Sequence, residues 1–415
     1  MSMGHSGVRD PRNMAVVKTL TFVMFAMFAM TTDSVGIIIP EVIRTFRLSL
    51  TAAGTFQYAT MGGIALAGLT LGQLADRFGR RQTILLGLTL FATACFLFAF
   101  GQNFVFFAAL MALSGIAIGI FKTGALALIG DLATSTRQHT SIMNTLEGFF
   151  GIGAIVGPAI LTQLLGAGLS WKWLYVIAGI ICLALIAVAL TVRYPTHAAA
   201  TPGTGFSGSA RAMKNPYVLG FSLGAFLYVG VEAAVYVWMP TLLAGYTGTA
   251  RSLAAYSISI FFLLRAAGRF LGAWMLSRVP WQAVLALFSG CILACFVVSV
   301  TGGVGWAVYL LPLSGLFMSV IYPTVNSKGI SCLSKSDHGA AAGVILFFTC
   351  VSAVLAPLAI GAVSDSFGQI VYGFWLAAVL ACLLFAGALI NWLVNPTGAV
   401  LERLDATDYR QELPI

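Results

Sequence analysis

The sequence predicts an all-α integral membrane protein with twelve transmembrane helices in two six-helix bundles. Of its 415 residues, 59% are hydrophobic and only 8% are charged, and the mean hydropathy is +0.96. Soluble domains carry about 25% charged residues, so this chain has too few charges to cover a water-exposed surface. A membrane-spanning helix needs roughly 20 apolar residues, which leaves room for twelve such helices with short loops. Lipid is therefore the expected main solvent.

Apolar stretches of suitable length follow one another along the whole chain. The longest interruption, 194–215, is rich in Pro, Gly, Ser and Thr, which is typical of a flexible linker. We expect this cytoplasmic linker to separate an N-terminal bundle, 1–193, from a C-terminal bundle with a short cytoplasmic tail, 216–415. The predicted spans are 16–40, 50–75, 82–101, 104–131, 140–165, 172–193, 216–244, 252–276, 281–301, 305–330, 339–363 and 369–393.

Basic residues are unevenly distributed between alternate loops. One set of loops and both termini hold most of them, as in the loop with Arg77, Arg80 and Arg81. The positive-inside rule therefore places both termini in the cytoplasm of a multi-pass protein, expected in a bacterial inner membrane. The net charge of +9 is spread over these loops and not clustered, so nucleic acid is not an expected partner. The opposite loops hold only Arg44, Arg47, Lys172 and Arg251.

Two short patterns recur in corresponding spans, about 200 residues apart. Leu113-Ser114-Gly115 in the fourth span returns as Leu313-Ser314-Gly315 in the tenth. Gly157-Pro158 in the fifth span is echoed by Ala356-Pro357 in the eleventh. Together with the linker, these matches favour a duplicated six-helix unit whose copies are related by an axis normal to the membrane.

The loop between the second and third spans reads Gly72-Gln-Leu-Ala-Asp76-Arg77-Phe-Gly79-Arg80-Arg81. It closely resembles the signature of the major facilitator superfamily of transporters. The resemblance implies a cytoplasmic latch, in which Gly72 permits close helix contact and Asp76 accepts hydrogen bonds across the bundle interface. The alternative is an ordinary positive-inside loop, which needs basic residues but neither the aspartate nor the glycines.

Other runs occur at Met143–Ile155, Gly268–Gly272, Leu276–Arg278, Ser319–Thr324 and Gly361–Asp365. They resemble the fucose–proton symporter family, and this resemblance adds Arg269 and Arg278 to the predicted latch. Members of that family carry acids in the first and fourth spans, where this chain has Gly36 and Lys122. Proton coupling must therefore come from other residues here.

A few ionisable residues lie inside the predicted spans. Each costs about 2.5–3.5 kcal/mol if exposed to lipid, so each is expected to face the interior or a partner. Lys122 with Asp33 and Glu147 in the first half is a natural proton relay, with Glu147 as the expected proton carrier. A static ion pair that fixes helix packing is the other interpretation. In the second half, pairing with each other and contact with substrate are both open for Glu232 and Arg265.

Aromatic and polar residues on the same spans are candidates for a substrate cavity. Aromatic rings stack on sugar faces, and hydroxyl and amide groups bond sugar hydroxyls. For any single aromatic residue, packing is the simpler explanation. The candidates are Asn144, Phe149, Tyr228, Tyr236, Trp238, Tyr322, Thr324 and Asn326.

Three classes of function remain open. Proton-coupled uptake of a sugar or another small polar or anionic solute is the leading prediction. A proton-driven exporter of drugs or metabolites is the alternative, although the fifth span has Leu161-Thr162 where exporters have glycines. A membrane receptor or enzyme is the third, but no Ser/His/Asp, HExxH or Cys/His pattern occurs in the sequence. We expect a monomer without cofactor or metal.

Overall fold

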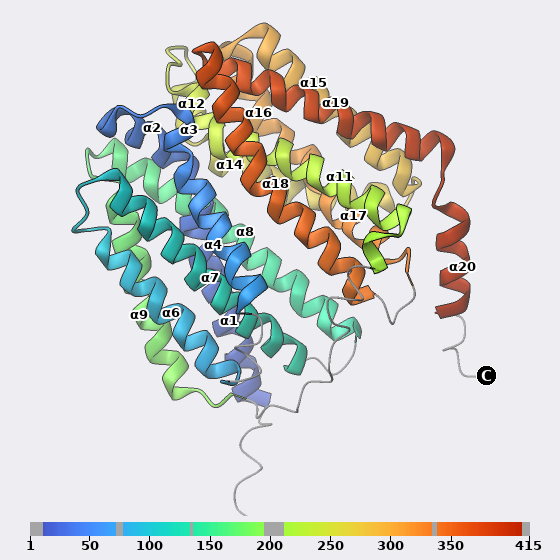
Figure 1. Ribbon diagram of the computed structural model, residues 1–415, viewed down its shortest axis with the longest axis horizontal. Helices are drawn as coiled ribbons and strands as arrows, with labels where there is room; N and C mark the ends of the chain where they lie inside the picture. Colours follow the sequence, from blue (N-terminus) through green and yellow to red (C-terminus); the bar gives the residue numbers. More distant parts are fainter. Residues whose placement is uncertain (1–10, 72–77, 133–135, 195–210, 334–337, 409–415) are drawn as a thin grey trace, which may run out of the picture. The chain divides into compact units, whose positions relative to one another are not determined.

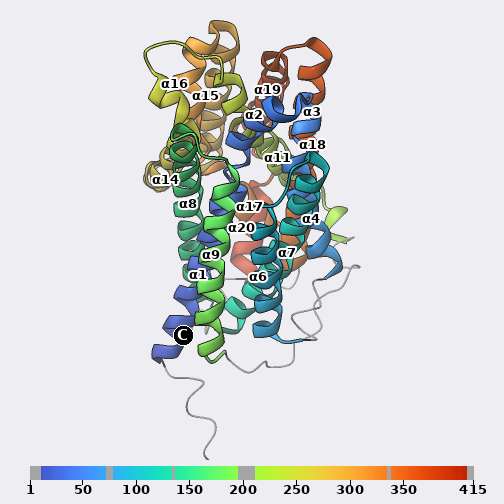
Figure 2. The ribbon, with the colours of Figure 1, turned by 90° about the vertical axis from the view of Figure 1, so that its left-hand side faces the viewer.

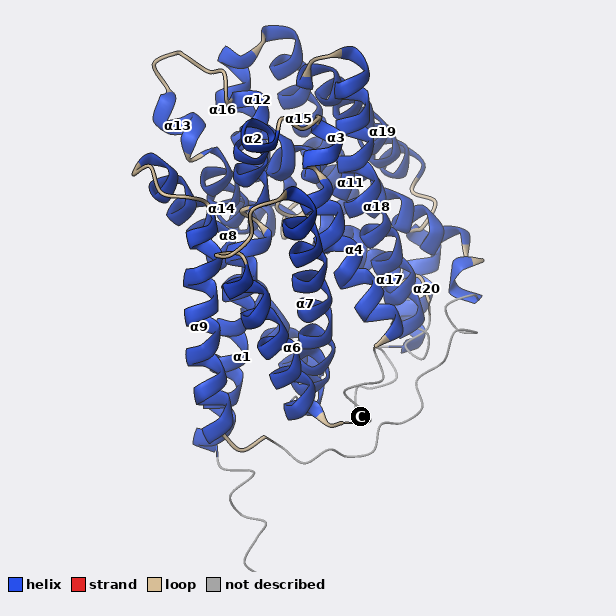
Figure 3. Ribbon diagram, turned by 60° about the vertical axis from the view of Figure 1, so that its left-hand side comes forward, coloured by secondary structure: helices blue, strands red, loops and turns tan. Residues whose placement is uncertain are grey.

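The computed structural model describes residues 11–71, 78–132, 136–194, 211–333 and 338–408. Within these residues the secondary structure consists of helices joined by loops, without strands (Figure 3). The chain divides into two compact units, Met1–Thr201 and Pro202–Ile415. Their boundary falls inside the segment 194–215, which the sequence marks as a linker.

The first unit contains the first six predicted spans. Its described helices are α1 (Pro11–Thr32), α2 (Val35–Phe46), α3 (Leu50–Ala53), α4 (Thr55–Thr70), α6 (Arg80–Leu97), α7 (Phe104–Leu132), α8 (Thr136–Gly166) and α9 (Lys172–Thr191). Helix α7 packs along both α4 and α6, whereas α1 packs along α8 and α9 (Figure 2). Helix α9 also contacts α6, which joins the two groups into one bundle.

The second unit contains the other six predicted spans. Its described segments are α11 (Pro216–Ala233), the π-helical segment η1 (Ala234–Trp238), α12 (Met239–Leu243), α13 (Arg251–Ala255), α14 (Ser257–Leu276), α15 (Trp281–Gly302), α16 (Val304–Met318), α17 (Ile321–Ile330), α18 (His338–Phe367), α19 (Ile370–Val394) and α20 (Gly398–Asp408). Helix α15 packs along α19 and α16, and α11 packs along α18 (Figure 1). Helix α14 packs along α16.

Ten helical segments of the described residues are long and apolar enough to cross a membrane, from Arg12–Phe46 to Ile370–Val394. They match ten of the predicted spans. The remaining two predictions correspond to α4, which the structure describes only up to its C-cap at Leu71, and to α6, whose first turn carries Arg80 and Arg81. These arginines lower the mean hydropathy of α6 and mark the membrane boundary. Every predicted span therefore corresponds to helix in the described residues.

The first span is not one continuous helix, because it divides after Thr32 into α1 and α2. The Thr32 hydroxyl donates to the Phe28 carbonyl at 3.2 Å, and the Ser34 hydroxyl donates to the Met30 carbonyl at 2.7 Å. Side chains that bond the preceding turn compete with the backbone hydrogen bonds of the helix. A run of short polar residues in an apolar span thus explains the division.

Two spans of the second unit are irregular near prolines. Pro240 has no N–H for the Tyr236 carbonyl one turn earlier, and the helix widens there into η1. Pro323 likewise offers no N–H to the Ser319 carbonyl, and the tenth span breaks there between α16 and α17. The seventh span stays helical through its π-helical segment, whereas the tenth contains non-helical backbone, which is tolerated only where other protein groups satisfy it.

Glycines of the repeated Leu-Ser-Gly pattern allow close helix contacts in both units. A Cβ added to Gly115 on α7 would overlap the Thr60 carbonyl oxygen on α4. A Cβ added to Gly315 on α16 would overlap the Phe261 carbonyl oxygen on α14. Small residues are what let helix backbones approach this closely in membranes. The pattern therefore marks equivalent contacts in the two units.

Candidate functional site

Lys122 on α7 and Glu147 on α8 lie on facing helix surfaces of the first unit. The Lys122 Nζ atom is 5.7 Å from the centroid of the Phe150 ring, which is within cation–π range. Glu147 precedes Phe150 by three residues, so the two side chains share a face of α8. Glu147 is exposed and Lys122 is partly buried. The structure thus brings these two predicted residues into the same region.

Asp33 lies at a different level of the same unit. The rings of Phe22 on α1 and Phe149 on α8 are 5.5 Å apart, which places Glu147 near the level of Phe22. Asp33 is farther along the first span by eleven residues, about 16 Å at 1.5 Å per residue. Its Oδ2 atom accepts a hydrogen bond from the Thr32 hydroxyl at 3.0 Å. This separation is too large for Asp33 and Glu147 to belong to one directly contacting cluster.

Glu232 on α11 and Arg265 on α14 form an ion pair in the second unit, between Oε1 and Nη1. Their side chains are only 10% and 22% exposed, respectively. Charges this well buried are stable only when they are paired. The Arg265 guanidinium also lies 6.0 Å from the centroid of the Phe262 ring. Of the two possibilities left open by the sequence, the structure shows the pairing.

Two tyrosines extend from this ion pair toward the break in the tenth span. Tyr228 precedes Glu232 by one helical turn, and its hydroxyl donates to the Met318 carbonyl at 3.1 Å. Met318 is the last residue of α16, where carbonyls lack intrahelical donors. Tyr322 stacks on Tyr228, with ring centroids 6.2 Å apart. Glu232, Arg265, Tyr228 and Tyr322 are called the second-unit polar cluster below.

Trp238 braces α11 and η1 against α18. It is 0% exposed, and its Nε1 donates to the Pro357 carbonyl at 3.1 Å. A second bond joins α11 and α18, because the Ser352 hydroxyl donates to the Phe226 carbonyl at 2.6 Å. The indole has no face open to a solute in this conformation, whereas Tyr236 is partly buried. The sequence did not single out Ser352, although it stands one turn before the repeated Ala356-Pro357 pattern.

The other predicted cavity residues are dispersed. Thr324 is buried on α17, where Asn326 and Tyr322 are partly buried. Phe149 is partly buried on α8 in the first unit. Asn144 belongs to α8, but its side chain lies outside the described residues. The second unit therefore contains the denser group of candidate side chains, on α11, η1 and α17.

Part of the predicted latch is visible in the first unit. Gly79 has a φ of +85° at the start of α6, a conformation that favours glycine. Arg80 is buried, and Arg81 donates to the Leu190 carbonyl at 2.7 Å. Arg81 also lies near Tyr194, whose pKa is raised by burial to about 12, so that its hydroxyl stays neutral. These contacts tie the start of α6 to the end of α9.

The remaining latch residues divide between the second unit and the undescribed loop. Arg278 lies 4.5 Å from the centroid of the Trp274 ring, at the end of α14. Arg269 is partly buried on the same helix. Residues 72–77 of the signature, among them Gly72, Asp76 and Arg77, lie outside the described residues.

One buried polar group was not predicted as functional. The Ser114 hydroxyl is 3% exposed, and the structure gives it no hydrogen-bond partner among the described residues. It faces a small cavity of about 10 Å³ that Thr60 and Tyr175 also line. This volume is close to that of one water molecule. The equivalent hydroxyl in the second unit, on Ser314, donates to the Leu311 carbonyl at 2.6 Å.

Comparison with known proteins adds a family to this geometry. Residues 21–357 match the family model described as Major Facilitator Superfamily. A glucose/galactose transporter of Brucella abortus is 24% identical over 88% of this chain and 91% of the relative. The L-fucose-proton symporter of Escherichia coli K12 is 23% identical over 84% of this chain and 86% of the relative.

Solved structures resemble the chain over nearly its whole length. The crystal structure of the E. coli fucose:proton symporter has a TM-score of 0.63 and 22% identity, covering 91% of this chain and 99% of that one. A bacterial homologue of the human lysosomal transporter Spinster has a TM-score of 0.75 and 16% identity, covering 92% and 97%. Both likenesses concern the fold, and they confirm the predicted all-α architecture of twelve membrane helices.

Proposed function

Since this chain belongs to the Major Facilitator Superfamily, it is a membrane transporter of a small molecule and not an enzyme, and we propose that it takes up a sugar or a similar polar or anionic solute together with a proton. In this proposal, transport proceeds by alternating access of one solute site to the two sides of the membrane. The two relatives by sequence are named for hexoses and for fucose with a proton, which supports this substrate class.

The observation that carries the coupling proposal is the buried pair of Glu232 and Arg265. Protonation of Glu232 leaves Arg265 charged without its partner, and stranding one member of a buried pair costs about 3–5 kcal/mol. Proton binding becomes favourable when a polar or anionic group of the solute takes the place of Glu232 at Arg265. Release of the solute restores the pair and expels the proton. Solute and proton therefore bind with positive coupling, as symport requires.

The residues around the pair suit a polyhydroxylated solute. Tyr322 offers an aromatic face, and Thr324 and Asn326 add a hydroxyl and an amide on the same short helix, α17. The break before α17 lies beside these groups, so a change in its geometry moves the aromatic face relative to Arg265. We propose that solute binding and proton binding meet at this helix break.

Lys122, Glu147 and Asp33, which the sequence predicts as a proton relay, are the alternative site for proton movement. Glu147 is exposed, so its protonation strands no buried partner. Asp33 lies about 16 Å farther along the first span, by the helical rise of 1.5 Å per residue, and would act only through intermediates. For these reasons we place the main proton on Glu232 and assign Lys122 and Glu147 a role in helix packing and solute attraction.

The topology is also a proposal. The excess of basic residues in alternate loops supports cytoplasmic termini and a cytoplasmic linker at 194–215. The bacterial relatives support an inner-membrane location. A monomer is sufficient, because each proposed cluster is complete within one unit of one chain.

Uptake into proteoliposomes tests the function directly. Radiolabelled glucose, galactose, fucose and sugar acids are offered with and without an imposed inward proton gradient. We expect accumulation of at least one of them above its external concentration, and collapse of that accumulation by a protonophore. Accumulation that does not depend on the proton gradient would contradict symport. Expulsion of preloaded solute against its own concentration gradient, driven by the inward proton gradient, would favour the exporter.

A matched pair of variants tests the carrier of the proton. Glu232→Gln mimics the protonated acid, so we expect it to abolish uphill accumulation while keeping counterflow of solute. Glu147→Gln makes the same chemical change in the first unit, and we expect it to accumulate solute normally. The reverse result would move the proton to Glu147.

A further inference from the structure

A large apolar groove in the second unit has no role in the transport proposal. Its volume is about 650 Å³, within the range of ligand pockets. Its walls come from α11, α15, α17 and α19, and its floor includes the chain between α19 and α20. The second-unit polar cluster does not line it. Residues from spans form most of the wall, so the groove lies at membrane depth.

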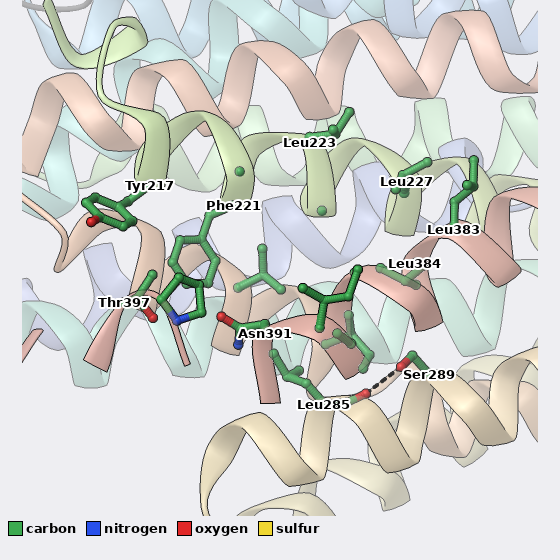
Figure 4. A pocket seen from close by; sticks show the side chains of 18 of the residues that line it. Tyr217, Phe221, Leu223, Leu227, Leu285, Ser289, Leu383, Leu384, Asn391 and Thr397 are labelled. Atoms are coloured by element: carbon green, nitrogen blue, oxygen red, sulfur yellow. Dashed lines mark hydrogen bonds between the residues drawn. The ribbon is translucent and has the colours of Figure 1, made fainter. Parts of the chain in front are cut away.

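The lining changes character from one end of the groove to the other (Figure 4). Tyr217, Asn391 and Thr397 gather at one end, where α11 begins and α19 finishes. Leu227 and Leu383 lie toward the other end, deeper in the spans. An amphiphile has the same arrangement, with a polar head at the membrane surface and an apolar chain in the interior.

The polar end contains an unused hydrogen-bonding group. Thr397 is 4% exposed, and its hydroxyl has no hydrogen-bond partner among the described residues. A buried hydroxyl without a partner costs about 1–3 kcal/mol, which a ligand acceptor would recover. The group therefore points to a polar ligand atom at this end of the groove.

Glycines keep the apolar part of the groove open. A Cβ added to Gly220 or Gly387 would meet no atom within 4 Å, and one added to Gly224 would meet only Val325, at 3.9 Å. These three glycines line the groove from α11 and α19. The walls therefore have room for a chain that slides between the two helices, and larger side chains could fill the space.

Positive charge lies beside the polar end. Lys328 Nζ is 5.8 Å from the centroid of the Trp281 ring, and Trp281 lies 6.0 Å from the ring of Phe221, a residue of the groove wall. Lys214 is exposed shortly before α11 begins. Helix α20 carries one arginine and three acids, Glu402, Asp405 and Asp408, so it adds no positive charge. The two lysines are therefore the groups that can attract an anionic head group.

We propose that this groove binds an anionic phospholipid, with one acyl chain between α11 and α19 and the head group at Thr397, Lys214 and Lys328. The lipid comes from the leaflet on the side of the chain termini. A transported sugar does not suit the groove, because the leucine-lined part offers it no hydrogen bonds. The inference does not depend on the proposed substrate or on proton coupling.

Photolabelling of the full-length protein in nanodiscs tests the proposal. The probe is phosphatidylglycerol with a diazirine on one acyl chain, diluted into phosphatidylcholine, and labelled peptides are identified by mass spectrometry. We expect label to concentrate on α11 and α19. Gly387→Leu fills the groove and should lower this label about tenfold, the equivalent of losing 1.4 kcal/mol of binding. The matched control is Gly305→Leu at the start of α16, where an added Cβ also meets nothing within 4 Å.

Two further variants separate the head group from the chain. Thr397→Val keeps the shape and removes the hydroxyl, and Lys214→Gln with Lys328→Gln removes the charges. We expect Thr397→Val to reduce labelling by both lipids, because both carry a phosphate acceptor, and the lysine variant to reduce the preference for labelled phosphatidylglycerol over labelled phosphatidylcholine. Equal label from the two lipids, or label spread evenly over lipid-facing helices and unchanged in Gly387→Leu, would overturn the proposal. If Gly387→Leu fails to fold, Gly220→Leu fills the groove from the opposite wall and decides the same question.

Discussion

The two units of this transporter repeat the same helix contacts about 200 residues apart. In the first unit, a Cβ added to Gly157 on α8 would overlap the Met30 carbonyl on α1. In the second unit the glycine is on the other helix, since a Cβ added to Gly230 on α11 would meet the Cβ of Ala356 on α18 at 3.2 Å. The close approach is kept while its glycine changes sides. The contact distance, and not the residue at one position, is therefore what the repeat preserves.

The units differ in how they treat charge at the equivalent level. The position that corresponds to Thr32 at the end of α1 is occupied by Glu232 at the end of α11. Glu232 has a buried partner, Arg265, where the first unit has an aliphatic residue, Ile64. The first unit instead carries a run of hydroxyl groups that divides its helix. The same arrangement of helices thus supports a buried ion pair in the second unit and a helix break at polar residues in the first.

The largest expected effect separates the buried pair from Lys122. Arg265→Met strands Glu232 and should cost about 3–5 kcal/mol of stability. Lys122→Met removes a partly exposed cation–π contact and should cost about 1 kcal/mol or less. Thermal unfolding of the purified variants in detergent measures both. The double variant Glu232→Gln with Arg265→Met should recover most of the loss, and equal losses at Arg265 and Lys122 would break the proposed difference between the units.

The repeated glycines should respond alike in the two units. Gly115→Ala and Gly315→Ala each force a Cβ against a backbone carbonyl, so we expect each to cost about 1–3 kcal/mol. Gly62→Ala and Gly305→Ala are the controls, one in each unit, because an added Cβ there meets no atom within 4 Å. Thermal unfolding of the four variants gives the comparison. A loss in only one of Gly115→Ala and Gly315→Ala would show that the contacts are not equivalent.

Two buried tyrosines give a smaller contrast. Tyr228 bonds a backbone carbonyl, whereas Tyr175 in the first unit contacts the Met111 sulfur at 3.4 Å. Sulfur is a weak acceptor. Tyr228→Phe should therefore cost about 1 kcal/mol, and Tyr175→Phe clearly less. Both changes keep the aromatic ring, so unfolding midpoints compare the hydrogen bonds alone; a larger loss for Tyr175→Phe would contradict the assignment.

The latch variant should change stability least of all. With the offset of 201 that pairs Thr60 with Phe261, the second unit has Ala273 where the first has Gly72, and Ser277 where the first has Asp76. If Asp76 serves switching between conformations, Asp76→Ala should lower the transport rate and leave equilibrium solute binding unchanged. We expect the same result when a bulky residue replaces Gly72. Rates from proteoliposomes and binding from isothermal titration test this. An equal loss of binding and transport would argue against a latch.

The residues of one loop carry the family signature, and hydropathy and segment length along the chain are enough to establish the membrane setting and the order and approximate limits of the spans. They suffice because lipid requires every spanning backbone to satisfy its own hydrogen bonds. The amino-acid pattern also marks Glu232 and Arg265 as unusual charges within spans. The Leu-Ser-Gly repeat locates equivalent helix contacts by its spacing alone, since close approach of helices depends on small side chains.

Which of those charges meet is a matter of helix packing. The spacing of residues along a chain does not show that Glu232 reaches Arg265. Nor does it show that Asp33 lies about 16 Å along its helix from the level of Glu147. Both depend on the relative height of two helices, which is set by how they pack. The same holds for the broken helix whose Met318 carbonyl is bonded by Tyr228, and for the lipid-sized groove between α11 and α19. These features depend on side chains from different helices, and their positions relative to one another follow from how the backbones pack.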